Sequence, residues 1–155
     1  ASSAMFIGFG MLYDRMKTRT MSDYGGVATV MPVFAAFYML FVMANVALPG
    51  TSGFVGEFMV IMASFQVSPW VAVAASLTLI VGAAYTLLMF KRVFYGPIHH
   101  KPVEALADIG YLDRTLMVIL ALFVLGLGLA PNGLLDLVHS SVGHVMQASL
   151  NHKLV

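Results

Sequence analysis

One acidic residue, Glu57, stands alone in a long apolar part of the sequence. Between positions 24 and 90 it is the only Asp, Glu, Lys or Arg residue. A carboxylate at membrane depth costs at least about 2.5–3.5 kcal/mol on the insertion scale, so such a residue faces protein or water and marks a functional site. Loss of hydration favours a protonated acid, and a nearby Lys favours the carboxylate. We therefore interpret Glu57 as a proton-relay residue, with a buried structural salt bridge or a position at an interface as the alternatives.

The residues before Glu57 predict a break in a helix. Pro49 cannot donate a backbone hydrogen bond, and Gly50 and Gly53 follow within four residues, which together interrupt helical pairing. Broken helices in transporters free backbone groups that line a cavity near the ion site. We expect the break to lie between Leu48 and Gly53, with unpaired backbone groups facing the protein interior.

Two further polar residues are candidates for a proton path. Asn45 precedes the break and could hold water toward Glu57, although a hydrogen bond between helices is an equal alternative. Ser64 lies seven residues after Glu57, on the helical face that Gly50 and Gly53 would share.

Other kinds of site are not indicated by the sequence. None of the five His residues has the spacing of a zinc helix, and the absence of Cys excludes thiolate metal sites and iron–sulfur clusters. The glycine-rich stretch at 50–56 lacks the Lys-Ser/Thr ending of a phosphate loop. We expect neither a metal nor a redox cofactor in this chain.

The composition places these residues in a membrane protein. Of the 155 residues, 60% are hydrophobic and 10% are charged, where a soluble domain carries about 25% charged residues. The mean hydropathy is +0.91. These values exclude a disordered chain, a nucleic-acid binder and most soluble enzymes. The formal net charge of +1 implies no strongly charged partner.

The apolar runs predict an all-α fold of polytopic membrane helices. Residues 1–12 are interpreted as the end of a helix that begins before the sequence. Three full-length or nearly full-length spans are expected at 27–48, 70–90 and 115–131, and a shorter helix at 54–65. Residues 1–131 then form a membrane domain, and residues 132–155 form an amphipathic C-terminal tail.

The number of crossings within residues 27–67 stays open at this stage. The stretch could make two crossings joined at the break, or one crossing and a re-entrant half, and its length favours two. The connection at 91–114 holds four basic residues against three at 13–24, which places 91–114 on the cytoplasmic side. With two crossings, the connection at 13–24 would lie outside.

Three segments resemble one family of membrane proteins. The run LPGTSGFVGEF at 48–58, with LYDRMKTR at 12–19 and YTLLMFKRVFYGP at 85–97, resembles the M-type antiporter-like subunit of NADH:quinone oxidoreductase, respiratory complex I. The mitochondrial counterpart is NADH dehydrogenase subunit 4. The resemblance covers essentially the whole chain, as the C-terminal third of a protein of fourteen membrane helices. Related Mrp-type antiporters typically carry Lys where Glu57 stands.

The resemblance implies a place and a role for the chain. It would supply the broken helix of the second of two inverted five-helix bundles, with Glu57 as the terminal proton-relay residue. NADH, FMN, iron–sulfur clusters and quinone would bind to partner subunits. The partners would be other membrane-arm subunits, above all neighbouring antiporter-like ones, in a bacterial inner membrane. The alternatives are an Mrp-type cation/proton antiporter subunit and a purely structural membrane subunit.

Overall fold

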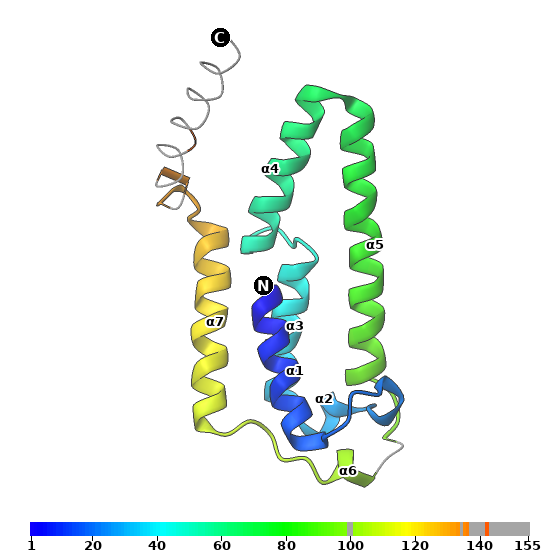
Figure 1. The fold of residues 1–155 in the computed structure, drawn as a ribbon. Coiled ribbons are helices and arrows are strands. Elements are labelled where there is room, and N and C mark those ends of the chain that lie inside the picture. Colours follow the sequence, from blue (N-terminus) through cyan, green and yellow to red (C-terminus); the bar gives the residue numbers. More distant parts are fainter. Residues whose placement is uncertain (99–100, 134, 137–141, 143–155) are drawn as a thin grey trace, which may run out of the picture.

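The computed structural model describes residues 1–98, 101–133, 135–136 and 142, and all its regular elements are helical (Figure 1). The predicted all-α fold is confirmed. The helices are α1 (Ser2–Met16), the 3-10 turn η1 (Met21–Asp23), α2 (Val27–Val30), α3 (Pro32–Asn45), α4 (Ser52–Val67), α5 (Pro69–Phe94), α6 (Lys101–Glu104) and α7 (Tyr111–Leu129). The predicted tail at 132–155 falls almost entirely outside the described residues.

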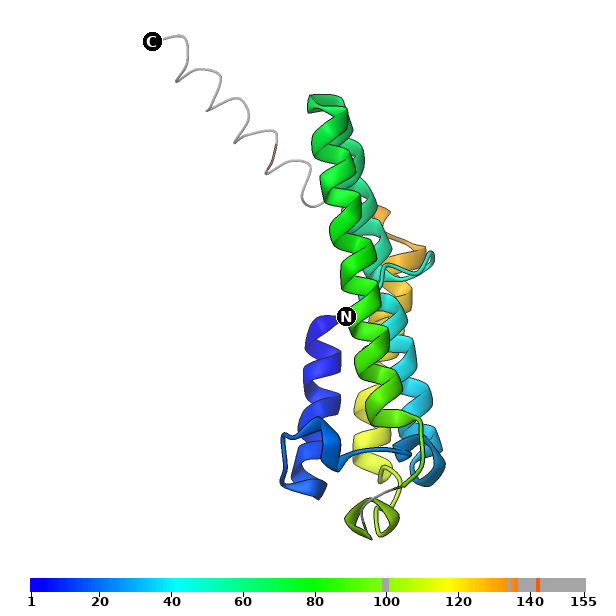
Figure 2. The ribbon, with the colours of Figure 1, turned by 90° about the vertical axis from the view of Figure 1, so that its right-hand side faces the viewer.

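Helices α3 and α4 form one broken crossing. Both views show α4 continuing in the direction of α3, while α5 returns alongside the pair (Figures 1 and 2). With 14 and 16 residues, α3 and α4 are about 21 and 24 Å long, so neither reaches the roughly 30 Å of a hydrocarbon core. The expectation of two crossings in 27–67 is therefore wrong, because the break redirects the chain very little.

The predicted helix at 27–48 is divided near its start. The backbone at Met31 leaves helical geometry, and Pro32 begins α3 as its first residue. The Asp108 carboxylate, from the loop before α7, accepts hydrogen bonds from the N–H groups of Val33 and Phe34 at 3.0 and 3.2 Å. A Pro fits the first helical turn because its missing N–H is unpaired there in any case. A distant carboxylate thus caps α3, which sequence spacing alone does not reveal.

Both polar connections lie at the same end of the bundle (Figure 1). Gly26 has a positive φ of 69° and lies against the loop after α5, where a Cβ atom would come within 3.0 Å of the Gly96 carbonyl oxygen. The expectation that 13–24 lies on the opposite side from 91–114 is corrected by this contact. It followed from the assumption of two crossings, and one crossing brings the two connections together.

Two helices are long and apolar enough to cross a membrane among the described residues, namely α5 and α7. Their most apolar windows are only 11% and 17% buried, unlike the core helix of a soluble protein. Along α5, the exposed Trp70 and the basic pair Lys91–Arg92 are separated by about 31 Å, which matches the distance between two membrane interfaces. The helix predicted at 115–131 begins earlier, at Tyr111, and is not short.

An ion pair joins helices α1 and α7. The Arg15 guanidinium lies 2.8 Å from an oxygen of Asp113 at the start of α7, and it also donates to the Met11 carbonyl. This contact, at the end of the bundle that holds the polar connections, fixes α1 against α7.

Candidate functional site

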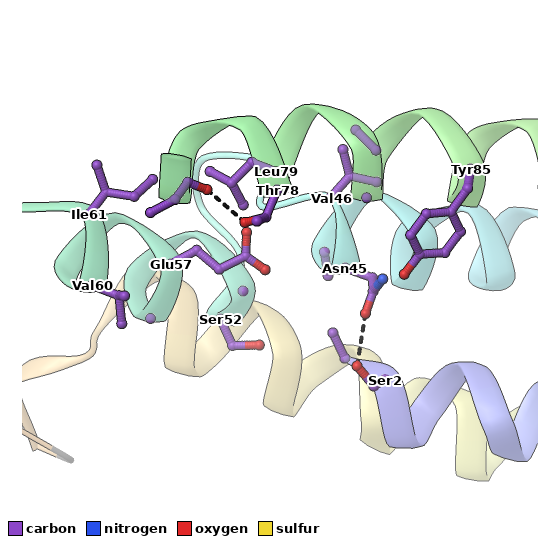
Figure 3. Close-up of a pocket in the computed structure, with 17 residues that line it drawn as sticks. Ser2, Asn45, Val46, Ser52, Glu57, Val60, Ile61, Thr78, Leu79 and Tyr85 are labelled. Carbon is purple, nitrogen blue, oxygen red and sulfur yellow. Dashed lines mark hydrogen bonds between the residues drawn. The ribbon is translucent and has the colours of Figure 1, made fainter. Parts of the chain in front are cut away.

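A cavity of about 640 Å³ opens where the broken helix meets α5 (Figure 3). Its walls come from the end of α3, the first three turns of α4, the middle of α5 and the first residues of α1. Three residues singled out from the sequence, Asn45, Gly53 and Glu57, line it together. The fold therefore brings the candidate acid, one candidate path residue and part of the predicted break to one place.

Glu57 projects from α4 into this cavity, on the side that faces α5 (Figure 3). One of its carboxyl oxygens, Oε2, is buried and has no hydrogen-bond partner in the described part of the chain. The ion pairs found among the described residues are Arg15–Asp113 and Lys17–Asp14, and neither involves Glu57. Among the described residues, the structural salt bridge that was one alternative for Glu57 is not formed.

Glu57 also lies deep along the membrane-spanning direction. The neighbouring Thr78 on α5 lines the same cavity, eight residues from Trp70 and thirteen from Lys91. These separations correspond to about 12 and 20 Å along the helix. The acid thus lies well inside the apolar zone, where an unpaired carboxylate is costly and a water-accessible cavity relieves that cost.

Asn45 makes the hydrogen bond between helices that was one of its two alternatives, and a role in holding water toward Glu57 stays a prediction. As the last residue of α3 it lines the cavity, and its side-chain oxygen accepts a hydrogen bond of 2.8 Å from the Ser2 hydroxyl of α1. This bond ties the end of α3 to the start of α1 (Figure 3). The carboxamide is thereby held in place beside the break.

The break spans residues 46–51, and local hydrogen bonds pair much of its backbone. Thr51 donates to the Leu48 carbonyl through both its N–H and its hydroxyl, at 3.1 and 2.7 Å. The N–H groups of residues 46, 47 and 48 are also paired, with carbonyls of α3. The expectation of unpaired backbone groups between Leu48 and Gly53 therefore does not hold for the N–H groups of Leu48 and Thr51. Turn hydrogen bonds replace the helical ones, and Gly50 allows them with a φ of 91°.

Glycine residues allow the break to pack tightly. Gly53 lies in the first turn of α4, where a Cβ atom would collide with the Ala44 carbonyl oxygen. Gly128 of α7 lies against the backbone of Gly50 and Thr51, and a Cβ atom there would collide with both. Pro49 is exposed. The break thus packs against α7 on one side and borders the cavity on the other.

Ser64 lies apart from this cavity. It is not among the residues that line it, and its hydroxyl donates to the Val60 carbonyl of its own helix at 2.8 Å. Because helices α4 and α5 extend beyond the cavity, a residue two turns after Glu57 shares its face without sharing its surroundings. A role for Ser64 in proton transfer stays a prediction.

The sequence analysis did not single out three polar residues of the cavity, namely Ser2, Thr78 and Tyr85. A signal for two of them was available, because Thr78 and Tyr85 lie seven residues apart with Gly82 between them, on one face of α5. No group of three or more His, Asp or Glu side chains in the described residues has a metal-binding arrangement.

Comparison with known proteins gives this arrangement a family. The sequence model described as "NADH:quinone oxidoreductase/Mrp antiporter, TM" matches residues 1–82, which include the break and Glu57. The chain belongs to this family. Its membrane location follows from that membership, and its helical architecture with a broken helix follows from the fold.

Individual members of this family match the chain over nearly the whole of its 155 residues. NADH-quinone oxidoreductase subunit M of Rhodobacter capsulatus is 41% identical over 146 residues, and NADH-ubiquinone oxidoreductase chain 4 of Chondrus crispus is 38% identical over 146 residues. Each alignment covers 94% of this chain, but 28% and 30% of the relative. The chain therefore spans less than a third of the length of the curated relatives that it matches.

A solved structure shows the same helical arrangement. A chain of respiratory complex I from Thermus thermophilus, determined with bound NADH, superimposes with a TM-score of 0.73 at 32% sequence identity. The match covers 84% of this chain and 27% of that chain. The fold described above is thus that of part of a complex I membrane subunit.

Proposed function

We propose that the chain is part of a proton-translocating membrane-arm subunit of NADH:quinone oxidoreductase, and that Glu57 carries protons in it. The relatives named as subunit M and chain 4 of that enzyme support the assignment. The observation that carries it is the position of Glu57, an acid without an ion-pair partner among the described residues, which lines a cavity beside a broken helix.

The cavity can stabilise either protonation state of the Glu57 carboxyl group. Water that entered the cavity would hydrate the ionised form, and the burial of one carboxyl oxygen without a partner favours the neutral form. A small change in either, such as a movement at the break or of a charge nearby, moves the proton on or off Glu57. This is the property that a proton-relay residue needs, and a purely structural residue does not.

The same proposal assigns the chemistry that this chain does not perform. NADH, FMN, iron–sulfur clusters and quinone are bound by partner subunits, and this chain contributes no redox site. Its partners are other membrane-arm subunits, including neighbouring antiporter-like subunits, and the lipid of a bacterial inner membrane. Residues 1–131 supply the translocating helices, and 132–155 form the amphipathic C-terminal tail.

Two other functions would use the same fold. A secondary cation/proton antiporter subunit of the Mrp type would need Glu57 without a redox partner, and a purely structural subunit would not need Glu57 at all. The relatives quoted above are oxidoreductase subunits, which favours a subunit of NADH:quinone oxidoreductase over one of the Mrp type.

The test replaces Glu57 in the intact complex. Glu57→Gln keeps the size and hydrogen bonding of the side chain but cannot release a proton, and Glu57→Asp keeps the charge with a shorter reach. We expect NADH-driven quinone reduction and proton pumping to fall together by about a hundredfold or more in Gln, the scale of general acid–base effects, and to recover partly in Asp.

The matched control is Glu104→Gln, which removes an exposed acid from the connection between α5 and α7. It should assemble and pump as the unmodified complex does. Assembly of all variants is checked on native gels. A Gln variant at position 57 that assembles and pumps at the unmodified rate would leave only the structural function.

A further inference from the structure

Tyr38, midway along α3, carries a buried hydroxyl group that the proton path described above does not use. Its side chain is 0% exposed, and the hydroxyl oxygen has no hydrogen-bond partner among the described residues. Burying a hydroxyl without a partner opposes folding, and a Phe side chain would fill the same space without that cost. The hydroxyl group therefore needs a functional explanation.

Aromatic rings from three helices enclose this residue. The ring centre of Tyr38 lies 4.8 Å from Phe94, 5.3 Å from Phe9, 5.8 Å from Phe34 and 6.2 Å from Phe90. On α1, Gly8 makes room for the ring, because a Cβ atom there would come within 2.7 Å of it. We call these five rings the aromatic cluster. The cluster lies between α1, α3 and α5.

The Glu57 cavity leads to one side of this cluster. A second cavity of about 240 Å³ shares Ser2, Asn45 and Tyr85 with the first and extends to Phe9 and Met89. Phe9 belongs to the aromatic cluster, and Met89 precedes Phe90, another member. The two adjoining cavities thus reach from Glu57 to the edge of the cluster.

A charged group, the Asp108 carboxylate, lies on the other side of the cluster. The Asp108 carboxylate accepts a hydrogen bond from the backbone N–H of Phe34, a cluster residue, at the end of the bundle that carries the polar connections. Along α3, Tyr38 is six residues after Pro32 and seven before Asn45, or about 9 and 10 Å. Its hydroxyl is the polar side-chain group of α3 that lies between these two ends.

We propose that the aromatic cluster is a gate to water between the Glu57 cavity and the charged end of the bundle, and that the Tyr38 hydroxyl binds the water that passes it. This inference rests on the proposed function of Glu57. It adds a positioning residue for water, and a route by which protons reach or leave the acid.

The composition of the cluster suits a gate better than a permanent channel. A stable buried water makes two to four hydrogen bonds, and here one hydroxyl group offers fewer. Apolar constrictions stay dry until a small change admits water. A single polar group inside such a constriction lowers the barrier to entry without keeping the passage wet, so protons do not leak at rest.

The first experiment is Tyr38→Phe in the intact complex, which removes only the hydroxyl oxygen. Water that enters the gate loses its hydrogen bond to the Tyr38 hydroxyl. NADH-driven quinone reduction and pumping should therefore fall together by about two- to tenfold. A residue that serves packing alone would leave both rates unchanged in this variant, with thermal stability equal or higher. Phe37→Leu, on the same helix but outside the cluster, is the control and should keep the unmodified rates.

The second experiment measures passive proton leak in proteoliposomes under an imposed pH gradient, without NADH. Phe90→Ala removes one ring of the cluster, so the leak should rise several-fold above that of the control Phe37→Ala. Normal pumping by Tyr38→Phe, or no added leak in Phe90→Ala, would overturn the gate. Glu57→Gln is measured in parallel, because a full rate in that variant refutes the proposed function itself, whereas a low rate there beside a normal Tyr38→Phe refutes only the gate.

Discussion

Glu57 and Asn45 reach one cavity from the two halves of a broken helix. Asn45 ends α3 and is held by Ser2, and Glu57 lies in the second turn of α4. A side chain that is held in place beside an acid can orient water toward it. Asn45 therefore differs from Ser64, the other residue proposed for this path from the sequence, because Asn45 lines the cavity and Ser64 does not.

The two candidates give a direct comparison. Asn45→Leu removes the carboxamide from the cavity wall while keeping a similar volume, so pumping should fall by about two- to tenfold, the effect of one or two lost hydrogen bonds. Ser64→Ala should leave pumping unchanged, because its hydroxyl bonds within its own helix. Proton translocation in inverted membrane vesicles measures both. Equal losses in the two variants would show that the cavity does not define the path.

At the scale of the elements, the sequence reveals the break but not what holds it. Pro49 and Gly50 predict an interruption because their backbone chemistry is local. The cap that Asp108 places on α3 joins groups more than 70 residues apart, and no local pattern encodes it. The same limit applies to the crossing number, since no local pattern encodes the angle between α3 and α4.

A pair of glycines in α7 tests how the break is held. Gly128 lies against the backbone of Gly50 and Thr51, whereas Gly126 has open space where a Cβ atom would be. We expect Gly128→Ala to cost about 1–3 kcal/mol through overpacking, and Gly126→Ala to be neutral or slightly stabilising because Ala favours helices. The temperature at which the complex dissociates on native gels measures the difference. If Gly128→Ala matched Gly126→Ala, α7 would not support the break.

At the scale of the whole molecule, one broken crossing determines which ends face the same side. Because α3 and α4 together cross once, the connections at 13–24 and 91–114 share an end, and the turn between α4 and α5 lies at the other (Figure 1). Together the two connections hold seven of the eight Lys and Arg residues of the sequence. A cytoplasmic position for that end agrees with the preference of basic residues for the cytoplasmic side.

Single cysteines at three exposed positions test this topology. Thr20→Cys and Glu104→Cys mark the two connections, and Gln66→Cys marks the turn between α4 and α5. With other cysteines of the complete subunit replaced, a membrane-impermeant maleimide should label positions 20 and 104 in inverted vesicles and position 66 in right-side-out vesicles. Two crossings in 27–67 would instead place 20 and 104 on opposite sides, because an added crossing exchanges the side of everything before it. Labelling of all three positions from one side would contradict the single broken crossing, since α5 separates position 66 from position 104 by a full span.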